Sequence, residues 1–442
     1  MSSDVMAAET TSGRVRFTIV AMLFCITVVN YADRATISIA GPLLSRDLGI
    51  SAIEMGFIFS AFGWSYVIGQ VPGGRLLDRF GSKTVYFWSI LLWSIFTILQ
   101  GGVMFTNAAV TIYVLFGLRF LLGFAEAPSL PANSRIVAAW FPDSERGTAA
   151  AIFNSAQYFA TVLFAPLMGW IVHEFGWHYI FYIMGSIGVG VAFIVLKTVY
   201  APRLHPRLSK LELDYIKSGG ALVEMDATGT GGRTRTRAET WSSIRSLLRS
   251  RMMIGIFLGQ YCISTLTYFF LTWFPVYLVQ QRGMSILQAG LVASIPAICG
   301  FTGGVLGGIF SDTLLRRGFT LTAARKTPIV LGMLLSSSMV LCNYVDAQWL
   351  IVTIMALAFF GKGIGALGWA VMSDTAPPQT AGLSAGLFNM FGNIASISTP
   401  IAIGYIIAFT GSFNGALVFV GANALVAVLS YLVIVGKIER LS

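Results

Sequence analysis

The 442-residue chain is 56% hydrophobic and only 11% charged, whereas a typical soluble domain is about 45–50% apolar and about 25% charged. This composition excludes an ordinary water-soluble protein and indicates a chain that lies mostly in a lipid bilayer. A net charge of +10 raises the question of nucleic-acid binding, but basic residues in membrane proteins usually mark the cytoplasmic side. We therefore expect a lipid bilayer, and no nucleic acid, among the partners of this protein.

Twelve apolar runs follow one another along the chain, each long enough to cross a bilayer as a helix of about 20 residues. They predict an all-α membrane protein with twelve transmembrane helices. The predicted spans are 15–40, 52–77, 84–105, 109–137, 147–172 and 177–198, then 252–280, 286–313, 326–344, 349–376, 382–408 and 413–437.

The spans divide into two groups of six around a polar segment. We expect an N-terminal six-helix bundle over residues 1–198, a cytoplasmic connector over 199–250 and a C-terminal six-helix bundle over 251–442. The connector should contain a short surface helix near 208–218 and should tether the bundles. If the N-terminus is cytoplasmic, only Arg46 and Arg282 of the basic loop residues lie outside, so both termini should face the cytoplasm.

The two halves resemble each other in sequence. The matches are Gly73-Gly74 and Asp78 with Gly307-Gly308 and Asp312, Phe153-Asn154 with Phe388-Asn389, and Pro166 and Gly169 with Pro400 and Gly404, at offsets of 234 or 235. An even number of spans per half predicts parallel repeats, which a pseudo-two-fold axis along the membrane normal relates. This arrangement is typical of transporters whose two bundles rock around a site at the bilayer midplane, and we expect a monomer.

The loop after the second predicted span carries a recognisable motif. It reads Gly74-Arg75-Leu76-Leu77-Asp78-Arg79-Phe80-Gly81-Ser82-Lys83, which resembles the G-x-x-x-D-R-x-G-R-K/R signature of the major facilitator superfamily, with serine in place of one arginine. Glycine permits close helix contact, and Asp78 and Arg79 can form charge-assisted bonds across the bundle interface, so the motif predicts a gate. The alternative is a solvated basic loop.

Five charged residues fall inside predicted spans, where charge is costly: Asp33, Arg34, Arg119, Glu126 and Lys362. Asp33 and Arg119 should lie at similar depth, which permits an ion pair that is either functional or purely structural. Glu126 has no obvious cation nearby in the sequence, and an unpaired buried carboxyl suits a proton carrier. Lys362 adds positive potential to an anion pathway or reaches into a wet vestibule, and both interpretations stay open.

Arg34 is the first candidate for binding a substrate anion, because its planar fork of donors matches a carboxylate. Polar side chains in other spans are candidates for binding hydroxyl groups, with interhelical hydrogen bonding or packing as the alternative role. The candidates are Tyr31, Tyr66, Asn154, Gln157, Tyr268, Trp369, Asn389 and Asn393.

At these residues the resemblance becomes narrower. Asn30-Tyr31-Ala32-Asp33-Arg34, Arg119 seven positions before Glu126, and Phe153-Asn154-Ser155-Ala156-Gln157 resemble the anion:cation symporter family. The stretch from Gly368-Trp369 to Gly392-Asn393 is similar to bacterial glucarate/galactarate permeases.

This resemblance implies proton-coupled uptake of sugar-acid anions across the bacterial inner membrane, with the proton as coupling ion and no other cofactor. It implies Arg34 on a substrate carboxylate, Asp33 and Glu126 as protonation sites, and Arg119 as the partner of Asp33. Around the sugar it implies Tyr31, Tyr66, Gln157, Trp369 and Asn389.

Other functions fit the sequence less well. A membrane enzyme or metal site is disfavoured because His173, His178 and His205 fall in loops or at helix ends, and no metal-ligand or nucleophile–base spacing occurs within the spans. A channel is disfavoured by the repeats and the buried titratable residues. Among carriers, a symporter of a monocarboxylate sugar acid such as galactonate or a hexuronate stays open, as does a carrier of aromatic acids or organophosphates.

Overall fold

The computed structural model describes residues 14–106, 108–224, 237–377 and 380–441. Within these ranges the chain forms helices and no strand, and twelve of the helices are long and apolar enough to cross a membrane. The predicted all-α fold with twelve membrane helices is therefore confirmed. Most spans extend beyond their predicted ends, because apolar helices continue past the bilayer into polar ends, as in Ala52–Phe80 and Asp143–Phe175.

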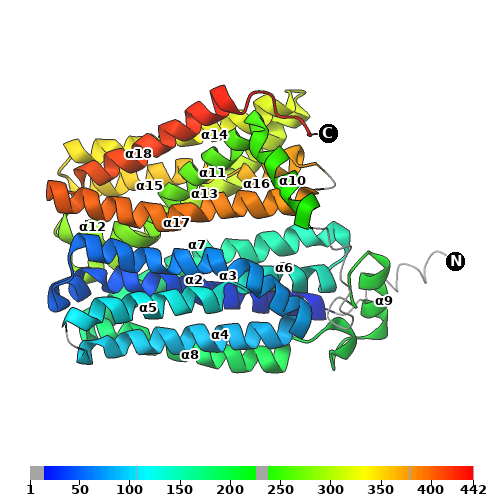
Figure 1. Ribbon diagram of the computed structural model, residues 1–442, viewed down its shortest axis with the longest axis horizontal. Coiled ribbons are helices and arrows are strands. Elements are labelled where there is room, and N and C mark those ends of the chain that lie inside the picture. Colours follow the sequence, from blue (N-terminus) through cyan, green and yellow to red (C-terminus); the bar gives the residue numbers. More distant parts are fainter. Residues whose placement is uncertain (1–13, 107, 225–236, 378–379, 442) are drawn as a thin grey trace.

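Six of the twelve spans belong to each half of the chain, and the two halves lie one above the other in Figure 1. The N-terminal half contains α2 (Val15–Leu48), α3 (Ala52–Phe80), α4 (Ser82–Gly101), α5 (Ala108–Glu126) with α6 (Ser129–Trp140), α7 (Asp143–Phe175) and α8 (Trp177–Thr198). The C-terminal half contains α11 (Arg251–Tyr268) with η3 (Phe269–Trp273) and α12 (Phe274–Gln280), α13 (Ile286–Arg316), α14 (Leu321–Ser337) with η4 (Ser338–Tyr344), α15 (Gln348–Ile364) with α16 (Gly368–Thr375), α17 (Ala381–Thr410), and α18 (Asn414–Leu429) with η6 (Ser430–Ile434).

The sequence repeat has a structural counterpart at the start of the second span of each half. Ser51 accepts a hydrogen bond from the backbone N–H of Glu54, whose side chain in turn accepts from the Ser51 backbone, and Ser285 and Gln288 form the same reciprocal arrangement. Such a capping box satisfies two donors that a helix start leaves unpaired. The two boxes stand 234 residues apart, so the repeat fixes where α3 and α13 begin.

The fourth span of each half is interrupted. Helix α5 ends at Glu126 and α6 begins at Ser129, with Pro128 between them, while α15 ends at Ile364 and α16 begins at Gly368. Proline has no N–H for the helical ladder, so a break follows there. Interrupted helices in transporters commonly line the binding site, and both breaks lie beside charged residues discussed below.

Helices α9 (Lys210–Ser218) and α10 (Arg237–Arg249) lie at one end of the molecule, which we call the connector end (Figure 1). The two halves touch through glycines at the opposite end, the far end. A Cβ added at Gly56 on α3 would lie 2.6 Å from the Pro400 carbonyl oxygen on α17, and one at Gly290 on α13 would lie 2.6 Å from the Ala165 carbonyl oxygen on α7. Gly56 and Gly290 are also 234 residues apart. Two equivalent backbone contacts therefore close the bundles against each other at the far end.

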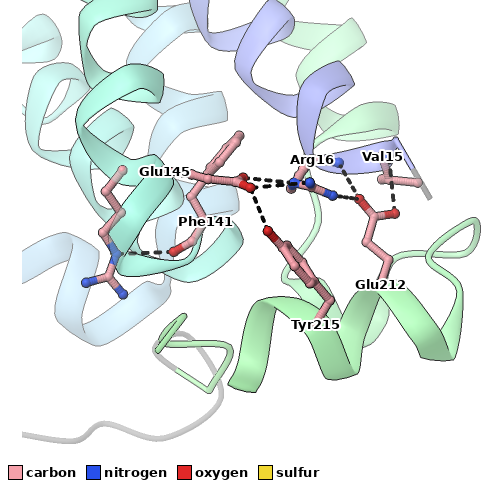
Figure 2. Close-up of polar contacts among 7 residues, drawn as sticks. Val15, Arg16, Phe141, Glu145, Glu212 and Tyr215 are labelled. Carbon is pink, nitrogen blue, oxygen red and sulfur yellow. Dashed lines mark hydrogen bonds and ion pairs between the residues drawn. The ribbon is translucent and has the colours of Figure 1, made fainter. Parts of the chain in front are cut away.

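The connector is anchored to the N-terminal half. The helix predicted near 208–218 is α9, and its Glu212 is fully buried. Figure 2 shows that the Glu212 carboxylate accepts the backbone N–H groups of Val15 and Arg16, both at 3.2 Å, and Arg16 Nη1 lies 3.3 Å from Glu212 Oε1. Because α2 has no side-chain cap of its own, Glu212 supplies its N-terminal cap.

Two further residues complete this anchor (Figure 2). Arg16 Nε lies 3.0 Å from Glu145 at the start of α7, and the Tyr215 hydroxyl donates to Glu145 Oε1 at 2.8 Å. The Arg16 guanidinium also lies 4.9 Å from the centroid of the Tyr215 ring. The anchor thus joins α2, α7 and α9, so that the first part of the connector moves with the N-terminal half.

We expect Glu212→Gln to lower the free energy of unfolding by about 1–3 kcal/mol, because a buried charge-assisted cap of α2 and the ion pair with Arg16 are lost together. The measurement is the thermal unfolding temperature of the purified protein in detergent. Asp214→Asn, an exposed carboxylate on the same helix, is the matched control and should unfold like wild type. Equal unfolding temperatures for the two variants would contradict a structural role for the anchor.

Candidate functional site

A cavity lies between the two halves, about halfway along α2. Its walls come from α2 and α7 on one side and from α11, η3, α12, α13 and α15 on the other. Inside it, the centres of water-sized molecules can occupy about 70 Å³, and the empty space is about 700 Å³ when open solvent is counted. Tyr31 and Gln157, both predicted site residues, line it on the N-terminal side. A ligand in this cavity would contact both halves at once.

Arg34 lies directly behind Tyr31, surrounded by aromatic rings. Its guanidinium carbon is 4.6 Å from the Tyr31 ring centroid, 4.7 Å from that of Phe62 and 5.0 Å from that of Tyr66. Cations are attracted to the faces of aromatic rings, more strongly where water is excluded, and Arg34 is 6% exposed. The sequence predicted Arg34, Tyr31 and Tyr66 as separate ligands, and the structure brings them together in one cluster.

Glu126 is the ionic partner of Arg34. Its Oε1 accepts from Arg34 Nε and forms the ion pair with Nη2, while Oε2 has no hydrogen-bond partner among the described residues. The expectation that Glu126 has no cation nearby was therefore wrong. The reason is tertiary: α5 ends at Glu126, and the long side chain of Arg34 reaches it from α2.

Asp33 and Arg119 are both buried but do not form the predicted ion pair. Neither Asp33 oxygen, nor Nε or Nη1 of Arg119, has a hydrogen-bond partner within the described part of the chain. Arg119 still acts on Asp33 electrostatically, so the two lie in one neighbourhood. The Arg119 guanidinium instead lies 5.7 Å from the Phe62 ring centroid, and Arg34 lies near the same ring. Phe62 therefore contacts both arginines.

A chain of hydrogen bonds joins the two halves on the connector side of the glycine contacts. The Tyr268 hydroxyl donates to Asn393 Oδ1 at 3.0 Å, Asn393 Nδ2 donates to Asn389 Oδ1 at 3.2 Å, and Asn389 Nδ2 donates to Gln70 Oε1 at 3.3 Å. Three of these four side chains are predicted site residues. Because Gln70 is on α3 and Asn389 on α17, the last bond crosses between the bundles and must break when they separate there.

Two predicted site residues lie apart from this cluster. Trp369 is half exposed, packs edge to face on Phe388 and lines a separate hollow together with Arg440, near the end of the chain. It does not line the central cavity in this conformation, because it follows the break between α15 and α16. Asn154 is exposed and lies one turn before Gln157 on α7, but only Gln157 lines the cavity.

The motif after the second span is arranged differently from the prediction. Asp78 pairs with Arg135 on α6 at 2.6 Å, within the N-terminal half and not across the bundle interface. A Cβ at Gly74 would meet nothing within 4 Å, whereas one at Gly73 would lie 3.0 Å from the Pro128 ring. Adjacent residues differ by about 100° around a helix, so the close helix contact uses Gly73 and not Gly74.

The rest of the motif shapes the turn between α3 and α4. Gly81 adopts a φ of 76° and donates its N–H to the Leu77 carbonyl, a backbone conformation that favours glycine. Arg79 stacks on the neighbouring Phe80 ring, and Lys83 Nζ lies 3.3 Å from the Tyr200 ring centroid. These contacts hold the loop against the N-terminal half.

Sequence reasoning missed two contributors and the partner of a third. Phe62 was not singled out, since a phenylalanine in an apolar span carries no distinguishing signal. Tyr158 lines the cavity beside Gln157, and its position next to a polar residue was the one available sign. Gln70 stood out as polar within an apolar run, but only the crossing of α3 and α17 shows that it bonds to Asn389.

The chain is similar to known proteins in sequence and in fold. Residues 23–324 match the family model described as Major Facilitator Superfamily. The chain is 63% identical over 443 residues to the probable galactarate/D-glucarate transporter GudP of Escherichia coli (strain K12), covering 100% of this chain and 98% of that protein. It is likewise 63% identical over 437 residues to the probable galactarate/D-glucarate transporter GudP of Bacillus subtilis (strain 168), covering 98% of this chain and 95% of that one.

Among solved structures, the fold is similar to that of a bacterial homolog of the human lysosomal transporter Spinster in an inward-facing and occupied conformation. The TM-score is 0.71 at 16% identity, over 96% of this chain and 95% of that one. This likeness concerns the fold alone. The family match, the full-length relatives and the twelve-helix fold agree with the resemblance found in the sequence: the chain belongs to the major facilitator superfamily.

Proposed function

We propose that the protein is a proton-coupled symporter that takes up sugar-acid anions, D-glucarate and galactarate in particular, by alternating access. The observation that carries this proposal is the Arg34–Glu126 ion pair, buried among aromatic rings beside a cavity between the two bundles. The names of the relatives supply the substrate class. The geometry supplies a reason why substrate and proton should be linked.

The link is competition for Arg34. While Glu126 is ionised, its carboxylate holds Arg34, and a substrate carboxylate gains little from the same guanidinium. Protonation of Glu126 would neutralise the pair and leave the cationic fork of Arg34 for the substrate, whose bidentate geometry it matches. A proton on Glu126 and an anion at Arg34 therefore favour each other, which is the thermodynamic requirement for symport.

Four of the buried charges, those in the membrane spans of the N-terminal half around Arg34, form a balanced set. Asp33 and Glu126 are acids, Arg34 and Arg119 are bases, and all four are at most 6% exposed. With every group ionised the set has no net charge, and protonation of Glu126 gives it one positive charge. An anionic substrate would restore neutrality, which limits the cost of burying charge while the bundles reorient.

Hydroxyl recognition is the proposed role of the polar side chains around the charged cluster. Gln157 lines the cavity, and the chain from Tyr268 through Asn393 and Asn389 to Gln70 supplies amides and a phenol that bond to one another. A substrate with several hydroxyl groups can exchange for these bonds at small net cost. An aromatic acid that broke these bonds would leave such groups unpaired.

The proposed orientation places the connector end in the cytoplasm of a bacterial cell, with the chain in the inner membrane. The basic loop residues support it, and α2 begins at the same end at which α9 lies. A monomer suffices in this proposal, because one chain supplies both bundles and the cavity between them.

We expect purified protein in liposomes to accumulate radiolabelled D-glucarate or galactarate when the outside is made more acidic than the inside. The membrane potential opposes entry of each negative charge by about 2.3 kcal/mol per 100 mV, so a dianion needs co-transported protons to accumulate. Uptake that ignores the pH gradient would contradict proton coupling. A panel that includes an aldonate, a uronate and an aromatic acid separates the substrate classes, and preference for the aromatic acid would contradict the proposed substrate.

We expect Arg34→Lys to lose most substrate binding although the charge is kept, because a lysine cannot reproduce the bidentate fork. The loss should be about 1.5–3 kcal/mol, or roughly 10- to 100-fold in affinity, measured by isothermal titration with D-glucarate. Arg46→Lys, at a largely exposed arginine beyond the far end of the cavity, is the control and should bind normally. If Arg34→Lys binds D-glucarate with wild-type affinity, the assignment of Arg34 to the binding site is wrong.

Glu126→Gln mimics the protonated state of Glu126 and should separate binding from coupling. We expect this variant to bind substrate and to exchange it across the membrane without a gradient, yet to fail in accumulation driven by a pH gradient. The paired measurements are counterflow and pH-driven uptake in the same liposome preparation, with Glu174→Gln at an exposed site as control. Wild-type accumulation by Glu126→Gln would move the coupling site to Asp33 or elsewhere.

A further inference from the structure

Lys362 is the one charged side chain among the described residues that line the central cavity. It is 6% exposed, and no ion pair or side-chain hydrogen bond is present for it within the described part of the chain. Its Nζ lies 5.0 Å from the Phe359 ring centroid and 5.6 Å from that of Tyr158, which belongs to the opposite half. A buried ammonium group without a counter-ion faces a cavity, and such charges in membrane proteins mark substrate pathways.

The backbone around Lys362 fixes its direction. A Cβ at Gly361 would lie 2.5 Å from the Gly332 carbonyl oxygen of α14, and a Cβ at Gly363 would overlap the Gly300 carbonyl oxygen of α13. The two glycines therefore let α15 pack backbone to backbone between two neighbours. Lys362, between them in sequence, is left on the side that faces the cavity. The backbone that carries Lys362 is therefore held rigidly, and the side chain differs from that of a lysine that extends to the membrane surface.

Lys362 and Glu126 lie at similar places in the two halves, although the repeat does not superpose them. Each lies within one turn of the end of the first segment of an interrupted fourth span, Glu126 on α5 and Lys362 on α15. At the offsets of 234 and 235 that the other matches show, Glu126 corresponds to Phe360 or Gly361, and each residue along a helix turns the side chain by about 100°. Near the break in its fourth span, the N-terminal half thus carries an acid that Arg34 neutralises, whereas the C-terminal half carries a cation that no described residue neutralises.

We infer that Lys362 binds one terminal carboxylate of a dicarboxylic sugar acid and thereby selects hexarates over monocarboxylate sugar acids. This inference rests on the proposed function and names the residue that would recognise the second acid group. Arg34, behind Tyr31 on the N-terminal side, takes the other carboxylate when Glu126 releases it. A hexarate has a carboxylate at each end of its chain, and the two cations lie on different bundles. An aldonate offers only one carboxylate and leaves one cation unpaired, which is costly in a low-dielectric site.

Such binding would also tie the substrate to the position of the bundles. A ligand held by Lys362 on α15 and by Gln157 or Arg34 in the other half is bound most tightly when the two halves are close together. A ligand can shift a conformational equilibrium only by its difference in affinity for the two states. A dianion that bridges the halves has this difference in affinity, because both of its carboxylates are bound only when the halves are close together.

The test compares D-glucarate with D-gluconate, which differ only in that one terminal carboxylate is replaced by a CH₂OH group. Affinities for both are measured by isothermal titration on purified wild type, Lys362→Gln and Lys362→Arg, with Lys326→Gln as a control for loss of one positive charge away from the cavity. We expect Lys362→Gln to weaken D-glucarate by about 10- to 100-fold and D-gluconate by less than about twofold. Lys362→Arg, which keeps the charge, should retain most of the preference for D-glucarate.

Two other outcomes would contradict either the assignment of Lys362 or the proposed function. Equal losses for both ligands in Lys362→Gln, or no loss for either, overturn the assignment of Lys362 to the second carboxylate while the proposed function stands. If the wild-type protein binds no hexarate, both the proposed function and this inference are wrong. If Lys362→Gln is not monodisperse, Lys362→Met replaces it, since methionine keeps the length of the stem and removes the charge.

Discussion

The ion pair between Arg34 and Glu126 is the interaction on which the rest of the site depends. Burying either charge alone would be costly, and the pair is stable because the two partners meet inside a ring of aromatic side chains. The pair also sets the geometry of its surroundings. Arg34 stacks on Tyr31, which lines the cavity, so a change at Glu126 is passed to the cavity wall through one arginine and one ring. In the proposed function, a proton on Glu126 would thereby act on a substrate that it never touches.

The repeat produces two similar bundles and two similar glycine contacts between them. Gly56 and Gly290 occupy equivalent places and pack on the equivalent helices α17 and α7, so the two far-end contacts are alike. Glycine at these points permits contact between backbones, which side chains of any other size would prevent. On the connector side the bundles are joined by a weaker polar bond between Gln70 and Asn389. The difference in contact type favours opening on the connector side.

The halves are alike in backbone and unlike in charge. Four of the buried charges, Asp33, Arg34, Arg119 and Glu126, lie together in the N-terminal half, whereas the C-terminal half contributes Lys362 at the cavity. In the proposed function, proton binding and part of the anion binding thus belong to one bundle, and the other supplies amides, aromatic rings and a single cation. A substrate between the bundles would then meet two chemically different walls and bind in a defined orientation.

The sequence by itself determined the number of spans, the repeat, the family and the identity of the five charged residues well inside the spans, because each is encoded locally in hydropathy, spacing or motif. It also indicated Arg34, Tyr31 and Tyr66, since polar residues in apolar spans stand out. Only the tertiary structure decided the pairing, because Arg34 meets Glu126 across a distance of 92 residues along the chain and spacing within one helix carries no information about its neighbours. The same holds for Asp78 with Arg135, for Trp369 beyond the break in α15, and for Lys362, which only the packing of three helices directs into the cavity.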